Sequence, residues 1–239
     1  MNIPISILAA GPGGLEELRF VWINATIEAK VIIFLLAIFS IFAWSVMASK
    51  AIQMSRARRL NNLFDTEFRA QSKVLGIFER RVQVEGCPLF SVYQTGCIEL
   101  DTRLKGTDGN RKKNITLKSM EHIKRSLEGS VARESLKLES GLILLAIAVS
   151  GAPFLGLLGT VWGVMQTFSY VGMAGKAELA TMAPGVSAAL ITTVAGLLVA
   201  IPSMFGYNWL VHSLRVLTVE LDNFAQELVS KMETEYLEE

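Results

Sequence analysis

Two long runs without a charged side chain constrain this chain more than any other feature. No Asp, Glu, Lys or Arg lies between Glu139 and Lys176, and none lies between Glu178 and Arg215. A charge at the centre of a bilayer costs on the order of 3 kcal/mol by insertion scales. We therefore interpret the two runs as membrane spans that are joined by a tight turn.

A third apolar run precedes these two. Residues 31–49 are uncharged and lie between Lys30 and Lys50. A helix of this length reaches roughly 28 Å, about one hydrocarbon thickness. Residues 1–13 have no basic start and are too short for a cleavable signal peptide, so we expect the N-terminus to be retained.

The charges around the first span predict its orientation. Four Lys and Arg residues lie between Lys50 and Arg59, and no acid follows until Asp65. The positive-inside rule therefore places the chain from residue 50 onward in the cytoplasm and the N-terminus outside. Residues 50–139 carry 18 Lys and Arg against 11 Asp and Glu, which is a net charge of +7. These basic residues are mixed with acids and few aromatics, a pattern that favours a solvated domain near lipid over nucleic-acid binding.

The apolar periodicity predicts an all-α, polytopic membrane protein with three transmembrane helices and long helices that extend into the cytoplasm. We expect a helix over 52–84, and another that begins near Ile115 and continues unbroken into the second span. The expected divisions of the chain are a short periplasmic N-terminus with an interfacial helix (1–30), the first span (31–49), a cytoplasmic helical segment (50–139), the second span (140–171), a periplasmic turn (172–183), the third span (184–211) and a cytoplasmic C-terminal helix (212–239).

Small residues distinguish the last two spans from plain lipid anchors. They let helix backbones approach closely, as in the GxxxG pattern. Pro153 should bend the second span, and Pro184 suits the first turn of the third. In the third span, a stripe of small residues follows the steps of a helix face: Ala189, Thr193, Gly196 and Ala200. We expect helix packing at Gly156, Gly159, Gly163, Gly196, Pro153 and Pro184.

The chain has no pattern typical of an enzyme. No Ser/His/Asp arrangement, phosphate loop, metal-ligand cluster or intramembrane carboxylate pair is present in the sequence. We therefore expect no catalytic residue, no metal and no cofactor. Cys87 and Cys97 lie in the segment placed in the cytoplasm, where a disulfide is not expected, and we interpret them as ordinary half-buried residues.

The same spans limit how an ion could cross. Proton relays in membranes commonly use Asp or Glu, and all three spans lack both. The hydroxyls of Thr160 and Thr193 could bind water or an ion but hold no charge at neutral pH. A proton path along these helices would therefore need a carboxylate from another chain. The alternative is that the hydroxyls only hydrogen-bond to their own helix or to a neighbour.

Two segments resemble a known family. The segments are FLGLLGTVWGVMQTF (residues 154–168) and APGVSAALITTVAGLLVAIPSMFGYN (residues 183–208). They are similar to the TolQ/ExbB/MotA family of ion-driven motor proteins, and the TVWG run and the AIPxxxxYN ending resemble the TolQ and ExbB branch most. The number and order of the spans agree with that branch.

The resemblance implies a function for the whole chain. It implies a homo-oligomer, a pentamer, around a single-span, ExbD- or TolR-like partner that carries the intramembrane Asp. Such a complex uses the proton motive force of the bacterial inner membrane to energise a cell-envelope process. The polar pore threonines of the family fall on Thr160 and Thr193, with Thr192 as a lesser candidate.

One position departs from the family pattern. Ala188 stands where TolQ and ExbB proteins commonly have a Glu in the third span. The alternatives are a non-conducting oligomeric scaffold, supported by the lack of charge in the spans, and a flagellar-type stator. Three spans and a short cytoplasmic segment argue against the stator.

Overall fold

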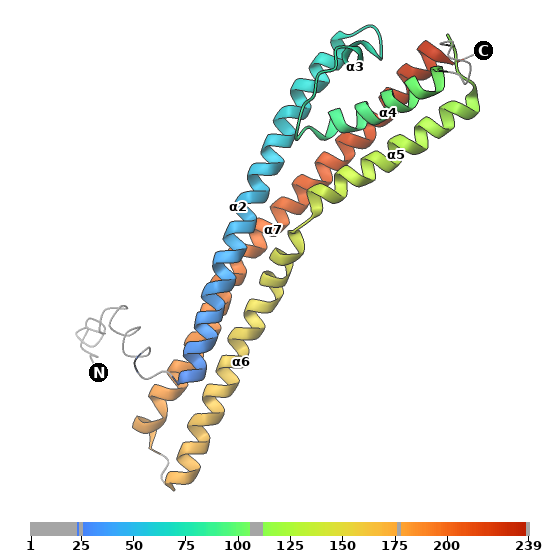
Figure 1. Ribbon diagram of the computed structural model, residues 1–239. Helices are drawn as coiled ribbons and strands as arrows, with labels where there is room; N and C mark the ends of the chain where they lie inside the picture. The colour runs from blue at the N-terminus through green and yellow to red at the C-terminus, as the bar shows by residue number, and fades with distance from the viewer. Residues whose placement is uncertain (1–22, 24–25, 106–111, 176–177, 238–239) are drawn as a thin grey trace, which may run out of the picture. The chain divides into compact units, whose positions relative to one another are not determined.

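The computed structural model describes residues 23, 26–105, 112–175 and 178–237 (Figure 1). Most of the expected N-terminal interfacial helix lies outside these residues. The described residues form helices joined by turns and irregular segments, together with an isolated bridge between Ile115 and Leu237. Its helices are α2 (Ile27–Ala70), α3 (Gly76–Glu79), α4 (Pro88–Leu104), α5 (Leu117–Glu139), α6 (Leu142–Ala174) and α7 (Leu179–Tyr236).

Three of these helices, α2, α6 and α7, are long and apolar enough to cross a membrane. The expectation of an all-helical protein with three long apolar helices is therefore confirmed. The chain divides into two compact units. The first unit comprises Met1–Met47 and Leu142–Tyr207, and the second comprises Ala48–Gly141 and Asn208–Glu239.

The expected unbroken helix from Ile115 into the second span is wrong. Helix α5 ends at Glu139, Ser140 leaves the helical conformation with ψ 133°, and Gly141 has φ 85°. Only glycine adopts this left-handed conformation readily, so the Ser-Gly pair ends the helix. The Lys50 ammonium donates to the Leu138 carbonyl at 3.3 Å and thereby satisfies one of the free carbonyls at this helix end.

The expected helix over 52–84 is also interrupted. Helix α2 ends at Ala70, and an irregular segment leads to the short helix α3. The Val74 amide donates to the Glu235 carboxylate of α7 at 2.8 Å, so a side chain distant in sequence replaces the helical acceptor. On the last turns of α2, Leu63 is exposed, whereas Phe64 and Phe68 are buried.

The core of the second unit joins α2, α4, α5 and α7. Five aromatic rings pack in it, with centroids of neighbouring rings 5.1–6.3 Å apart: Phe64, Phe68, Phe90, Tyr93 and Phe224. Helix α5 buries an apolar stripe at helical spacing, Met120, Ile123, Leu127 and Val131, whereas Leu117 is exposed. Cys87 and Cys97 are free and fully buried in this core, rather than half-buried.

Helix α7 runs without a break from Leu179 to Tyr236. Pro184 therefore lies inside the helix, at its sixth residue, and not in the first turn as the sequence suggested. A proline there removes one backbone hydrogen bond, which costs least near a helix end. Pro153 and Pro202 also lie inside helices.

Candidate functional site

The candidate site is the contact between α6 and α7 in the first unit. Gly156 on α6 lies so close to α7 that an added Cβ would sit 2.8 Å from the Thr192 carbonyl oxygen and 3.0 Å from the Thr193 Cα. At Gly163, an added Cβ would lie 2.7 Å from the Ala189 Cβ. These separations are shorter than van der Waals contact, so the two helices touch through their backbones.

The contact is reciprocal. An added Cβ at Gly196 on α7 would lie 2.6 Å from the Ala152 carbonyl oxygen and 3.2 Å from the Gly156 Cα. Ala152 is itself fully buried. We call this contact the glycine seam; it is formed on α6 by Ala152, Gly156, Gly159 and Gly163, and on α7 by Gly185, Ala189, Thr192 and Gly196.

The seam brings the hydroxyls of Thr160 and Thr193 together. They hydrogen-bond to each other, and each also lies 3.2 Å from the Gly156 carbonyl oxygen. Thr160 further reaches the Ala189 carbonyl oxygen at 3.4 Å. Both side chains are only part-buried. Thus the two threonines that the sequence singled out form one polar pair at the edge of the seam.

Thr192 has a different environment. It is fully buried and donates to the Ala189 carbonyl at 2.7 Å or to the Gly156 carbonyl at 3.0 Å. Its Oγ1 would lie 2.5 Å from a Cβ at Gly159. This hydroxyl is enclosed between the helices, where it supports their packing.

The Gly156 carbonyl cannot satisfy all three hydroxyls. A carbonyl oxygen has two lone pairs, and in a helix one of them accepts the backbone N–H four residues later. Thr160, Thr192 and Thr193 thus compete for the other one. The Thr192 hydroxyl can donate to the Ala189 carbonyl instead. Of the two remaining hydroxyls, one can donate to the Gly156 carbonyl and the other to its partner threonine. Each hydroxyl of the pair retains a lone pair that can accept a hydrogen bond from water.

Sequence reasoning missed part of the seam. Gly185 packs against the Thr167 hydroxyl, which donates to the Gly163 carbonyl at 2.8 Å. Gly185, Ala189, Thr192 and Gly196 follow steps of four, three and four residues, a helical spacing that is compatible with the seam on α7 but does not single it out. Ala200, at the end of the stripe proposed from the sequence, packs with Ala152 of the seam and with Ile32 and Leu36 of α2.

Ala188 does not lie in the polar pair. It is 1% exposed and packs against Ala29 of α2, which is 3% exposed. A methyl group fits this contact, whereas a carboxylate would need more room and a polar partner. The structure therefore gives the alanine a packing role between two helices of the same subunit.

A family model matches residues 101–223, and its description is the MotA/TolQ/ExbB proton channel family. Over 222 residues, the chain is 32% identical to the Tol-Pal system protein TolQ of Haemophilus influenzae, which covers 90% of this chain and 93% of that protein. The chain belongs to the MotA/TolQ/ExbB proton channel family.

Other members of the family show the same relationship. The biopolymer transport protein ExbB of Xanthomonas campestris pv. campestris is 40% identical over 126 residues, 53% of this chain and 49% of that protein. ExbB of Neisseria meningitidis is 28% identical over 194 residues, 81% of this chain and 87% of that protein. Together with the three apolar helices, these relatives identify a multi-pass protein of the inner membrane.

Proposed function

We propose that the chain is the multi-span subunit of a proton-conducting complex that energises a process of the cell envelope, such as outer-membrane transport or envelope maintenance. The observation that carries the proposal is the part-buried Thr160–Thr193 pair, set in an α6–α7 seam of a proton-channel family member. The pair offers lone pairs to water in a stretch of chain without charge.

A second chain has to complete the proton path. The runs 140–175 and 179–214 contain no Asp or Glu, so the titratable group comes from elsewhere. We propose an ExbD- or TolR-like partner with one span, whose Asp lies beside Thr160 and Thr193 in a ring of five copies of this chain. The chain then spans the membrane three times, with its N-terminus in the periplasm and its C-terminus in the cytoplasm.

In this complex the threonines position water and do not titrate. A hydroxyl that donates to Gly156 or to its neighbour can accept from a water molecule, and that water can pass a proton to the partner's Asp. Thr192 holds the helices together behind the pair. Position 188 is an alanine that is buried against Ala29, so the proposed proton path uses no acidic group there.

The test is proton flux in liposomes that contain this chain together with its partner. Thr160→Val and Thr193→Val remove the hydroxyl and keep the shape of the side chain. Each should abolish partner-dependent flux while the oligomer still assembles. Thr167→Val is the matched control, because the Thr167 hydroxyl donates to its own helix and lies outside the pair. Full flux in both pair variants would contradict the assigned path.

A scaffold without ion flux is the second candidate. The threonine hydroxyls already find partners within one subunit, which is what a purely cross-linking role needs. The same liposomes separate the two functions, since a scaffold assembles with its partner but passes no protons. A wild-type complex without flux would favour the scaffold.

A further inference from the structure

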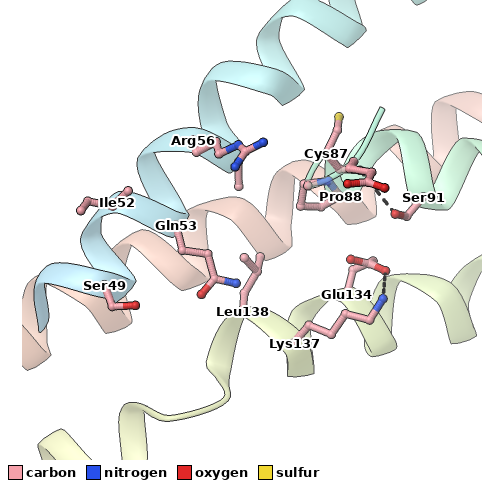
Figure 2. A pocket seen from close by; sticks show the side chains of 13 residues that line it. Ser49, Ile52, Gln53, Arg56, Cys87, Pro88, Ser91, Glu134, Lys137 and Leu138 are labelled. Carbon is pink, nitrogen blue, oxygen red and sulfur yellow. Dashed lines mark hydrogen bonds and ion pairs between the residues drawn. The ribbon is translucent and has the colours of Figure 1, made fainter. Parts of the chain in front are cut away.

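The second unit contains a pocket of about 560 Å³ that the proton path does not use (Figure 2). Helix α2 contributes one wall, the segment before and within α4 a second, and the last turns of α5 a third. The polar and charged side chains that matter here are Gln53, Arg56, Glu85, Ser91, Glu134 and Lys137.

Two opposite charges in this pocket, those of Arg56 and Glu85, have no partner among the residues that the structure describes. Neither Arg56 nor Glu85 forms a hydrogen bond or an ion pair with any other described residue. The other two charges neutralise each other, because Lys137 pairs with Glu134 at 2.6 Å. The pocket therefore offers one uncommitted guanidinium and one uncommitted carboxylate.

Arg56 and Glu85 come from neighbouring walls of the pocket, and the turn at Gly86 brings the walls together. Gly86 has φ 82°, and a Cβ added there would lie 3.9 Å from the Arg56 Nε. The guanidinium thus packs against the turn to which Glu85 belongs. Figure 2 shows Arg56 extending from α2 toward Cys87 and Pro88. A ligand in this pocket can meet both charges at once.

The pocket begins where the first span ends. Lys50 is the first charged residue after residues 31–49, and Ser49 and Ile52 line the pocket. Arg56 follows Lys50 by six residues, which is about 9 Å along a helix. The headgroup layer of one leaflet is roughly 5–8 Å thick. We infer that the Arg56 backbone lies just outside the lipid headgroups, within reach of its long side chain, while Ile52, 70% exposed, lies nearer the acyl chains.

The α5 wall of the pocket is hydrogen-bonded to the residue that follows the first span. The Lys50 Nζ lies 3.3 Å from the Leu138 carbonyl oxygen and 3.4 Å from the Ser140 Oγ. Leu138 lines the pocket, and the charge-free run of the second span begins at Ser140. Two walls of the pocket are thus continuous in sequence with apolar runs, which makes a lipid a better-placed ligand than a soluble molecule.

We propose that this pocket binds the phosphoethanolamine headgroup of a membrane phospholipid. The Arg56 guanidinium donates to the phosphate oxygens in the forked geometry that suits phosphate. The Glu85 carboxylate accepts hydrogen bonds from the primary ammonium. Arg56 and Glu85 together complement a zwitterionic headgroup. A purely anionic headgroup would leave the Glu85 carboxylate without a partner. A choline headgroup has no N–H to donate to Glu85.

The proposal is independent of ion flux and of the direction in which the chain is inserted. The experiment uses the full chain in mixed micelles, with native mass spectrometry to measure binding of phosphatidylethanolamine, phosphatidylcholine and phosphatidylglycerol. We expect phosphatidylethanolamine to bind most tightly. Loss of one charge-assisted hydrogen-bonded contact weakens binding about tenfold. Arg56→Gln and Glu85→Gln should each show this effect for phosphatidylethanolamine.

Matched variants separate the pocket from general surface charge. Arg58→Gln removes a neighbouring exposed charge of α2, and Glu128→Gln removes an exposed charge of α5; neither residue lines the pocket. Both should bind phosphatidylethanolamine like the wild type. Equal loss in the matched variants, equal binding of the three lipids, or wild-type binding by Arg56→Gln and Glu85→Gln would each overturn the proposal.

A final arm tests whether the ligand is a lipid or a free molecule. Soluble O-phosphoethanolamine at millimolar concentration should not displace the bound lipid, because it lacks the acyl chains that would lie near Ile52. Complete displacement at that concentration would overturn the assignment to a membrane lipid.

Discussion

The hydroxyl of Thr160 on α6 hydrogen-bonds to the hydroxyl of Thr193 on α7, and the Gly156 carbonyl lies 3.2 Å from each of them. The absence of a side chain at Gly156 makes this arrangement possible, since it lets the two backbones touch. The polar pair and the glycine seam are thus parts of one structure, and stability and conduction should respond differently to changes in each part.

The first prediction concerns the energetic coupling of the two threonines. Thr160→Val and Thr193→Val should each lower the free energy of unfolding slightly, and the double variant should cost less than the sum of the two. Hydrogen bonds between membrane helices contribute about 0.6 kcal/mol on average, so we expect a coupling of about that size. A double-mutant cycle from unfolding in mixed micelles measures it, and strictly additive losses would contradict the hydrogen bond.

The second prediction separates the seam from ordinary helix glycines. Gly156→Ala places a methyl group against the backbone of α7 and should destabilise the chain by about 1–3 kcal/mol. Gly172→Ala is the control, because nothing lies within 4 Å of a Cβ added there. That change should be neutral or should stabilise α6 by about 0.5–1 kcal/mol. Thermal unfolding of both variants makes the comparison, and equal effects would argue against backbone contact at Gly156.

The third prediction concerns the break between α5 and α6. Gly141→Ala forces a residue with a Cβ into φ 85° and should cost about 1–2 kcal/mol. Gly129→Ala is the matched control, since Gly129 lies inside α5 and has no positive φ. That change should raise helix stability. Circular dichroism during thermal unfolding reports both effects, and a gain in stability for Gly141→Ala would mean that the helix continues through this residue.

The spans were predictable from the sequence because charge is so costly in a bilayer. The apolar stripe of α5 was also predictable, from Met120 to Val131, because burial follows helical periodicity. The break at Gly141 was not, since a lone Ser-Gly pair also occurs inside helices and only the backbone angle distinguishes the two cases. The expected position of Pro184 was wrong for a similar reason. Proline is enriched in the first turn of helices but also occurs further inside them.

The sequence predicted which threonines belong to the candidate site, but not which helix faces meet there. Thr160 and Thr193 were found through the family pattern, and the structure brings them together. Periodicity alone cannot say which neighbouring face of α7 meets α6. Gly185 and Thr167 were missed because their contact depends on the depth at which the helices touch.

The last prediction concerns the buried thiol of Cys97. Burial raises the pKa of this thiol from 9.0 to about 12. At pH 8 its thiolate population is therefore about a thousandfold lower than in the unfolded chain, and thiol reagents should label it only after denaturation. Cys87 is also buried, and its pKa is likewise raised by burial.

The raised pKa of the Cys97 thiol also predicts how the free energy of unfolding changes with pH. A group whose pKa is higher in the folded state stabilises the fold fully below its unfolded pKa, and that contribution is lost as the pH rises through the folded value. The free energy of unfolding should therefore fall between pH 9 and pH 12. The pKa of Tyr93 is also raised by burial, so its phenol acts in the same direction. Cys97→Ala should reduce the slope without abolishing it. Denaturant titrations across this pH range measure the slope, and an unchanged slope in Cys97→Ala would contradict the assignment to the Cys97 thiol.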